Sequence, residues 1–328
     1  MTDWRLTGLF DLRAPLSHIG ETIGTTAYLA EEPIRQPDGS YLDVFCYAGN
    51  AWRGQLRDLA SLYLLHRLDN PRLPLDTFHL LFSGGRIGGD MVVDLDRARQ
   101  YRQAIPLVAL WGGGVGNQIL PGKLRVANSY PLCHEALSAL PARYRPLVTS
   151  TYRDMTFEKS FSRTDDGKNP AYDRFRALPA PVQGALLAGD DGAAPTPAKP
   201  KRDGPADQMR MTVELVAVGT QLATEITLRD ASEVELGCLT SALYTFARSP
   251  HIGGQASRGH GAVSLAYTVR DLDRGEEERF FICDGDTPVL FPPAEAALHA
   301  YDAHVLRLYQ EMLVEQGGTI RGLLGVAS

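Results

Sequence analysis

The stretch MRMTVELVAVGTQLATEITLRD, residues 209–230, constrains the fold more than any other part of the sequence. Apolar residues recur at nearly every second position on both sides of Gly219 and Thr220. This alternation is typical of half-buried strands, and a glycine-containing turn between two such runs is typical of a β-hairpin. The segment therefore predicts two strands that pair with each other as a hairpin.

A helix and a further strand follow the predicted hairpin. Ser232 precedes Glu235 by three positions, which is the spacing of a capping box, and apolar residues then recur at spacings of three and four up to Phe246. These signals predict a helix over 233–248. Beyond a glycine-rich stretch, the alternation over 263–269 predicts a strand that returns from the loop.

The N-terminal part of the chain supplies another strand and another helix. WRLTGLFDLRAPLSHIG contains a strand that ends near Pro15, and Asn50 is a suitable N-cap for a helix whose apolar face begins at Trp52. The full order is strand-helix, a long insertion, then strand-strand-helix-strand. That order predicts an α+β protein with a ferredoxin-like, RRM-like core, which is the split βαβ arrangement.

These elements divide the chain into three parts. Residues 1–68 and 209–270 make up the predicted core, which is discontinuous in sequence and is called the palm here. Residues 69–208 are an insertion expected to form an extra subdomain, and 271–328 are expected to form an acidic helical extension packed on the core. Within the insertion, 189–207 is dense in Ala, Gly, Pro and charge, which predicts a flexible loop.

Composition argues against several classes of protein. No apolar run approaches the roughly 20 residues of a membrane helix, and the N-terminus lacks the profile of a signal peptide. We therefore expect a cytoplasmic protein without a membrane partner. The four cysteines lie far apart with no CxxC pair, a pattern that indicates neither a zinc site nor a disulfide framework. No metal site and no cofactor are predicted.

Charge is distributed unevenly along the chain, whose formal net charge is −6. Acidic residues gather between 271 and 315, whereas 123–176 is rich in Lys and Arg. This asymmetry indicates one surface for a polyanion and another surface for different contacts.

Arg53 and Arg57 lie one turn apart at the start of the first predicted helix. A cation in the first turn opposes the helix dipole, so Arg53 is unfavourable there unless an anion is present as well. A bound phosphate would resolve the conflict, because free backbone N–H groups at a helix start favour anions. A solvated basic face, or a salt bridge to Asp58, is an equally good explanation.

The glycine-rich stretch HIGGQASRGHGAV, residues 251–263, follows a helix and opens a strand. RNA-recognition sheets carry a basic-Gly-aromatic-Gly element in this position, but His260, Ala262 and Leu265 stand here where stacking rings would be expected. Glycines without rings favour close passage of a sugar-phosphate backbone over sequence readout. The alternative is a tight turn with a core histidine.

Residues 150–176 alternate in a way that predicts a projecting basic β-finger, turned back at Asp166 and Gly167. Phe157 or Phe161 could insert between bases, although a merely solvent-exposed hairpin remains open. For catalysis, Glu31, Glu32 and His18 could do acid-base work, but no sequence spacing fixes their geometry.

Three motifs, in this order, resemble the RAMP superfamily, specifically the backbone subunit that lines the guide RNA in multisubunit CRISPR effector complexes. They are PLSHIG at 15–20, GNAWRGQLR at 49–57 and GGQASRGHG at 253–261. Within the insertion, Trp111 and Gly112 and the stretch GKLR at 122–125 are similar as well. The type IV backbone subunit is the most similar and type III is the runner-up.

The resemblance implies a thumb hairpin near 150–176 that folds over RNA. It also implies guide RNA, further copies arranged head-to-tail, capping and large subunits, and a target nucleic acid paired to the guide as partners. Type III relatives carry a cleaving Asp where this chain has Glu31, Glu32 and Pro33, so no catalytic residues are expected, and a type III-like ribonuclease is the alternative. The predicted RNA contacts are Ser17, His18, Asn50, Trp52, Arg53, Arg57, Lys123, Arg125, Arg153, Phe157, Lys159, Arg163, Gly253, Gly254, Arg258, Gly259, His260 and Gly261.

Overall fold

An antiparallel seven-stranded sheet organises the computed structural model, which describes residues 1–86, 95–115, 117–162, 210–285, 287–313 and 319–325. Its strand order is β15-β14-β13-β1-β12-β8, with β9 also paired to β12. The strands are β1 (Thr2–Leu12), β8 (Leu124–Val126), β9 (Tyr130–Pro131), β12 (Gln221–Ala231), β13 (Val263–Asp271), β14 (Glu277–Cys283) and β15 (Pro288–Leu290).

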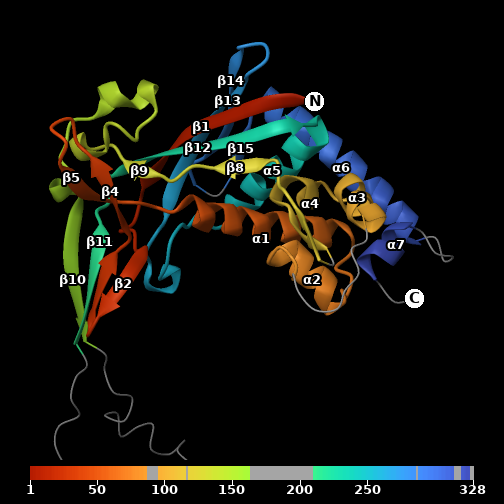
Figure 1. Cartoon of the computed structure of the whole chain (residues 1–328), viewed down its shortest axis with the longest axis horizontal. Coiled ribbons are helices and arrows are strands. Elements are labelled where there is room, and N and C mark those ends of the chain that lie inside the picture. Colours follow the sequence, from red (N-terminus) through yellow and green to blue (C-terminus); the bar gives the residue numbers. More distant parts are fainter. Residues whose placement is uncertain (87–94, 116, 163–209, 286, 314–318, 326–328) are drawn as a thin grey trace, which may run out of the picture.

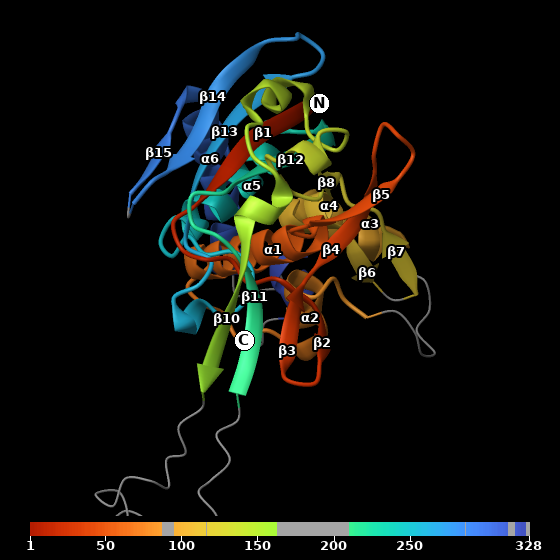
Figure 2. The ribbon, with the colours of Figure 1, turned by 90° about the vertical axis from the view of Figure 1, so that its left-hand side faces the viewer.

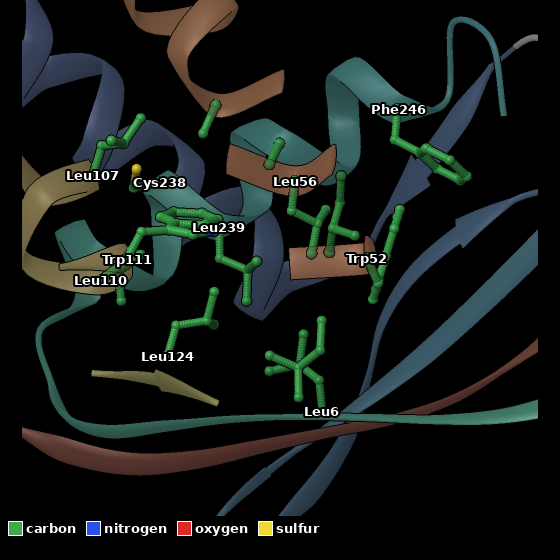
Figure 3. Packing of buried hydrophobic residues seen from close by; sticks show 14 of the residues in the cluster. Leu6, Trp52, Leu56, Leu107, Leu110, Trp111, Leu124, Cys238, Leu239 and Phe246 are labelled. Atoms are coloured by element: carbon green, nitrogen blue, oxygen red, sulfur yellow. The ribbon is translucent and has the colours of Figure 1, made fainter. Parts of the chain in front are cut away.

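Helices gather on one side of this sheet (Figure 1). They are α1 (Gly49–Arg67), α2 (Leu75–Phe82), α3 (Leu95–Ala104), α4 (Pro106–Trp111), α5 (Glu233–Phe246), α6 (Pro292–Leu313) and α7 (Thr319–Leu324). Figure 3 shows how apolar side chains of α1, α4 and α5 meet Leu6 of β1 and Leu124 of β8 in the core. The apolar stripes of the helices are thereby removed from water against the sheet.

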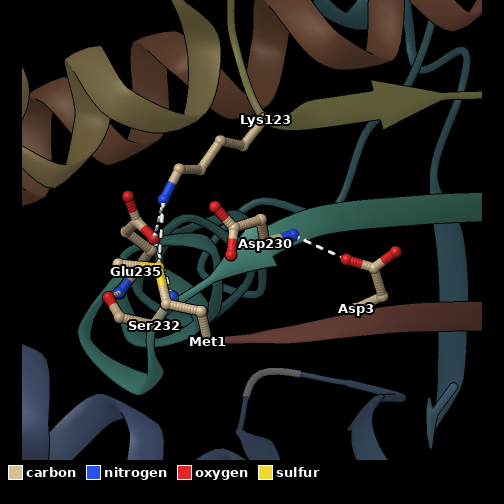
Figure 4. A network of polar contacts seen from close by, with 6 residues as sticks. All are labelled: Met1, Asp3, Lys123, Asp230, Ser232 and Glu235. Atoms are coloured by element: carbon tan, nitrogen blue, oxygen red, sulfur yellow. Dashed lines mark hydrogen bonds and ion pairs between the residues drawn. The ribbon is translucent and has the colours of Figure 1, made fainter. Parts of the chain in front are cut away.

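The start of α5 agrees with the sequence prediction. Ser232 Oγ accepts a hydrogen bond from the Glu235 N–H at 3.2 Å, and the Glu235 carboxylate accepts one from the Ser232 N–H at 2.7 Å. Lys123 Nζ lies 2.9 Å from the same carboxylate, beside Met1 (Figure 4). Predicting this capping box from local sequence succeeded because both of its partners are local.

The protein is α+β, as predicted, but its second core strand is not the predicted one. In chain order, β1, α1, β8, β12, α5 and β13 give strand-helix-strand-strand-helix-strand, the split βαβ arrangement, with other elements inserted between them. The prediction assigned the second strand to the alternating run before Gly219, whereas the sheet uses β8, a strand of only three residues inside the predicted insertion. A strand that short carries little periodic signal.

The predicted hairpin is wrong in its pairing, although both of its strands exist. β11 (Arg210–Val216) belongs to a second sheet of order β10-β11-β3-β2, with β10 (Thr156–Ser162), β3 (Thr26–Leu29) and β2 (Ile19–Ile23). Between β11 and β12 the chain crosses from one sheet to the other. The backbone at the end of β1 and just after it takes the place that the predicted hairpin partner would have. Leu16 exchanges hydrogen bonds with Val216, and the Gly219 N–H donates to the Leu12 carbonyl.

The predicted finger is also paired differently. Tyr152–Met155 is a 3-10 helix, η3, whose capping box is formed by Thr151 and Asp154, so the predicted strand begins only at Thr156. β10 pairs with β11, and Ser162 lies opposite Arg210 (Figure 2). The predicted turn at Asp166 and Gly167, Arg163 and the predicted loop at 189–207 lie outside the described residues.

Two small sheets and several 3-10 helices complete the described chain: β4 (Glu31–Arg35) with β5 (Tyr41–Phe45), β6 (Gly113–Val115) with β7 (Gln118–Leu120), η1 (His134–Ala136), η2 (Ala142–Leu147) and η6 (Ala256–Arg258). A second apolar cluster joins β4 and β5 to the segment around η1 and η2. Within the described ranges, no helix combines the length and the apolar character needed to cross a membrane.

Candidate nucleic-acid interface

Arg57 is buried, with 6% of its surface exposed. Its Nε donates to the Leu81 carbonyl at 2.6 Å, and its Nη2 donates to the carbonyls of Leu80 and Gly112 at 2.6 and 2.9 Å. These oxygens stand at the C-terminal ends of α2 and α4, where carbonyls lack intrahelical partners and carry partial negative charge. Burial, aided by the charge of Arg53, lowers the pKa of Arg57 to about 10, which leaves it cationic at neutral pH.

The predicted phosphate contact by Arg57 is therefore wrong, since its donors are occupied inside the protein. Arg53 lies on the same helix face and is half-buried, and its Nη2 donates to the Trp111 carbonyl. Trp111 Nε1 returns a hydrogen bond to the Arg53 carbonyl at 2.9 Å. Burial lowers the pKa of Arg53 as well. Both arginines stabilise helix ends, an explanation that the local sequence did not offer.

Two further predictions at the start of α1 need correction. Trp52 is fully buried, donates through Nε1 to the Tyr267 hydroxyl at 3.2 Å and packs edge-on against Phe10, so it cannot reach RNA. Asn50 is the second residue of α1 and not the N-cap that the sequence had predicted. Ala48 occupies the N-cap position, and its side chain makes no capping hydrogen bond.

The first helical N–H of α1 is capped from a distant part of the chain. Asn128 Oδ1 accepts from the Gly49 N–H at 2.8 Å. Asn128 can reach this group because Gly49 lies directly against β8, where an added Cβ would collide with the Val126 carbonyl oxygen. The helix start therefore has a neutral side chain at its first N–H.

The carboxylates considered for acid-base work are held by different partners. Glu32 accepts from Asn128 Nδ2 at 2.9 Å and from the Tyr130 hydroxyl at 2.5 Å. Glu31 accepts from the Tyr152 hydroxyl at 2.6 Å. His18 Nε2 stands 3.5 Å from the Ala48 N–H, and burial lowers the pKa of its imidazole. The three groups are thus anchored separately.

The glycine-rich loop packs on the PLSHIG segment, so part of its backbone is not accessible to a ligand. The Gly254 N–H donates to the Ser17 carbonyl at 2.6 Å, and the Gly261 N–H donates to the Pro15 carbonyl at 2.8 Å. Gly253 has φ of 71° and an added Cβ there would strike the Ser17 carbonyl. These glycines therefore permit two protein backbones to meet, which is a structural reason for part of the motif.

The strand β10 brings a second set of predicted residues to this loop. Lys159 Nζ lies 5.3 Å from the ring centroid of Phe161, and the Arg258 guanidinium carbon lies 5.7 Å from it. The His260 ring centre is 6.3 Å from the same ring. We call Lys159, Phe161, Arg258 and His260 the Phe161 cluster. It places two exposed cations on one aromatic ring, although about a hundred positions separate them in sequence.

Buried polar atoms lie beside this cluster. His260 is 3% exposed and Ser17 is fully buried, so neither side chain is presented to a ligand in this arrangement, and the core-histidine interpretation is confirmed. Burial lowers the pKa of His260, and the charges of Lys159 and Arg258 lower it further. Within the described part of the chain, His260 Nδ1 and Ser17 Oγ are buried without a hydrogen-bond partner.

The other predicted contacts divide by exposure. Lys123 pairs with Glu235, and the two side chains are 17% and 10% exposed, so an RNA contact by Lys123 would compete with this ion pair. The predicted positions that remain exposed or half-exposed include His18, Asn50, Arg53, Arg125, Arg153, Phe157, Lys159, Gly253, Gly254, Arg258 and Gly259. Sequence reasoning missed the anchor from Gln55 Nε2 to the His251 carbonyl at 2.6 Å, which ties the loop to α1 and has no local sequence signal.

Comparison with known proteins gives one finding at the level of the fold. No family model and no curated protein matches the sequence. A solved structure titled "Type IV-B CRISPR Complex" contains a chain of similar fold, with a TM-score of 0.53 and 20% identity, over 80% of this chain and 90% of that one. The chain shares the fold of a subunit of that complex. The similarity covers most of both chains, so it includes more than the sheet.

Proposed function

We propose that this chain is a non-catalytic backbone subunit that binds CRISPR guide RNA through its sugar-phosphate backbone and oligomerises along it in a type IV effector ribonucleoprotein. The observation that carries the proposal is the Phe161 cluster. The glycine-rich loop at 253–261 and the strand β10, which belongs to the predicted thumb segment, meet there in a chain whose fold is similar to that of a type IV complex subunit.

The chemistry of the cluster suits a phosphate. Lys159 and Arg258 repel each other, and the negative face of the Phe161 ring offsets only part of that repulsion. An anion between the two head groups would remove the remainder. Gly259 has φ of 80° and open space where a Cβ would stand, so a sugar-phosphate backbone can approach the loop closely there.

The same arrangement supports binding that does not depend on base sequence. The loop carries glycines and a cation in the positions where RNA-recognition sheets carry stacking rings. A guide of arbitrary sequence has only its backbone in common with other guides, so phosphate contacts suffice to hold it. We infer that Phe157, which is 39% exposed and two positions from Lys159 on β10, inserts between bases of the bound RNA.

A non-catalytic role is supported by how the acidic residues are used. Glu31 and Glu32 accept hydrogen bonds from tyrosine and asparagine side chains that hold β4 in place. The runner-up, a type III-like ribonuclease, requires turnover of target RNA that is abolished by Glu31→Gln, Glu32→Gln or His18→Ala. Incubation of the assembled particle with labelled target RNA tests this directly, and such cleavage would replace our proposal.

Further copies of the chain, other effector subunits and a target strand paired to the guide complete the proposed assembly. Glu295 and Glu311 are exposed on α6, and we propose that they contact a basic surface of the next copy. Contacts of this head-to-tail kind propagate along RNA without closing into a ring. Glu295→Lys with Glu311→Lys should then shorten assemblies on RNA, and unchanged assembly would refute this contact.

The first experiment is size-exclusion chromatography with the 260/280 nm absorbance ratio, before and after nuclease treatment. A large, RNA-rich species containing protected RNA supports the proposal. A monomer that retains no RNA, even when mixed with guide RNA and partner subunits, contradicts it.

The site itself is tested with matched variants. Lys159→Gln with Arg258→Gln should weaken binding of all single-stranded RNA sequences about equally and reduce the log-log salt slope by about 0.7 for each lost phosphate contact. Arg72→Gln with Arg307→Gln removes the same charge from two other exposed positions and should change neither quantity beyond a small screening effect. Loss for some sequences only would contradict backbone recognition.

A further inference from the structure

A row of arginines crosses the face of the seven-stranded sheet that points away from the helices. Arg5 of β1 lies opposite Arg270 of β13 on one side and opposite Thr227 of β12 on the other, and Thr227 lies opposite Arg125 of β8. Directly paired residues share a sheet face. The alternate positions Leu6, Ile226 and Val269 are buried in the core, so the row faces away from it.

The charges of this face are incompletely balanced. Arg5 Nε lies 3.6 Å from Glu225, and the exposed pair of Arg229 with Asp3, on the same face, is separated by 3.9 Å. Ion pairs that are this exposed contribute little in water.

Arg125 and Arg270 are exposed and make no ion pair within 4 Å with any described residue. Glu277 lies opposite Arg270 on β14, and its pKa is lowered by hydrogen bonds to Thr268 and Arg143 and, less strongly, by the charge of Arg270. The row thus ends on β8 in an arginine without an ion pair among the described residues, and on β13 in an arginine that shares Glu277 with Arg143.

The row lies well away from the Phe161 cluster. Leu16, which bridges to Val216 of the second sheet, follows the end of β1 at Leu12. Arg5 is seven residues back along β1 from Leu12, roughly 23 Å at about 3.3 Å per residue. Arg143, next to η2, donates to Thr268 and pairs with Glu277, which lies opposite Arg270, so the chain itself covers the face from beside Arg270 toward the Leu12 end.

We propose that this arginine row binds the sugar-phosphate backbone of a single-stranded nucleic acid, at a second site distinct from the Phe161 cluster. Neighbouring strands are about 4.8 Å apart, so the row spans about 14 Å, enough for more than one phosphate. Arginine forks suit phosphate oxygens, and the hydroxyl of the half-exposed Thr227 stands between Arg5 and Arg125 as a further donor.

A nucleic acid fits this face better than a protein partner. The row contains three arginines and one threonine, whereas the buried centre of a protein interface is depleted in charge and enriched in aromatic and apolar side chains. The chain as a whole is acidic, with a formal charge of −6, so a cationic row on one face is a local exception to its composition.

The test compares three double variants of the full chain that each remove two positive charges. Arg125→Gln with Arg270→Gln removes the two end arginines of the row, Lys159→Gln with Arg258→Gln alters the Phe161 cluster, and Arg72→Gln with Arg307→Gln is the control. Binding of a 4-thiouridine-containing single-stranded RNA is measured from 0.1 to 1 M salt. Photo-crosslinked peptides are then identified by mass spectrometry.

The row variant should lose about 1.4 from the salt slope, which is about 25-fold in affinity at 0.1 M salt and little at 1 M. Wild-type crosslinks should map to peptides of β1, β8 or β13. Arg125→Lys with Arg270→Lys should recover most of the affinity because the charge remains. The lysine pair also controls for folding, and all variants should unfold at the wild-type temperature.

The outcomes separate this inference from the proposed function. Losses and crosslinks at the Phe161 cluster alone would overturn the second site and leave the function standing. Losses and crosslinks at the row alone would support the second site and overturn the proposed role of the cluster. If neither variant differs from the control, both ideas fail. Unchanged RNA binding with altered self-association would make the row a protein interface and overturn the inference.

Discussion

At the scale of single residues, the type and position of a side chain proved easier to predict than its partner. The sequence indicates that Arg53 and Arg57 share a helix face and that a cation there needs negative charge nearby. That charge comes from carbonyl oxygens at the ends of α2 and α4, which no sequence pattern had placed next to α1. The prediction that the two arginines need negative charge nearby was correct, but the predicted source, a bound phosphate, was not.

Arg57→Ala is expected to destabilise the fold instead of selectively weakening RNA binding. Three buried carbonyls would lose a charged donor, so the free energy of unfolding should fall by about 3 kcal/mol. Urea denaturation of this variant beside Arg72→Ala measures the difference. A normal stability with reduced RNA affinity would mean that Arg57 contacts RNA after all.

The histidine of the Phe161 cluster should titrate below its ordinary range. Because its folded pKa is lowered, the unfolded chain takes up the proton first, and stability from this group falls as pH drops below about 6.5. Lys159→Gln with Arg258→Gln removes the two charges that contribute, so the pKa should rise part of the way, while the larger effect of burial remains. NMR titration measures it, with His18, whose pKa is lowered by burial, as the internal control.

At the scale of elements, periodicity and capping signals identified strands and helices, whereas pairing required information from distant parts of the chain. The helix at 233–248 was predicted nearly to its ends because its apolar spacing and capping box are local. The strands at 210–216 and 221–231 were predicted correctly, but they do not pair with each other as a hairpin. The segment at and after the end of β1 bonds to Val216 and to the residues between the two strands instead. The alternation of apolar and polar residues shows which side chains of a strand face the core, but it does not show which strands lie next to it.

The candidate site follows the same division. The glycine-rich loop and the basic finger were singled out from residue types and from the family resemblance, and the structure brings Lys159 and Arg258 to one ring. Burial was not predictable in the same way, because Trp52, Arg57 and His260 lose their exposure to elements far away in sequence.

The remote cap of α1 gives a prediction for an element. Asn128→Ala removes the acceptor of the Gly49 N–H and should lower the free energy of unfolding by about 1 kcal/mol. Asn50→Ala changes an exposed helical residue without a capping bond and should cost close to nothing. Thermal unfolding of the two variants, measured side by side, distinguishes a cap supplied by Asn128 from one supplied by Asn50. A larger loss of stability in Asn50→Ala than in Asn128→Ala would mean that Asn50 is the cap.

At the scale of the whole molecule, the two sheets are joined by chain crossings, and the strands β10 and β11 end as a directly opposed pair. Ser162 and Arg210 face each other in an antiparallel ladder, which is the geometry that a two-residue turn closes. Replacing 163–209 by Asn-Gly should therefore leave the near-ultraviolet circular dichroism and the unfolding temperature of the rest unchanged. Loss of cooperative unfolding in this shortened chain would show that the segment is needed for folding.

The position of β1 in the middle of the seven-stranded sheet has a consequence for how the protein is made. This strand is synthesised before the strands that pair with it on either side, because β12 and β13 begin at residues 221 and 263. At ordinary rates of synthesis, its amide groups wait on the order of ten to forty seconds for the first of these partners. Ribosome-bound chains therefore carry an unpaired apolar strand through most of translation, and folding of the palm is delayed until the C-terminal third has been produced.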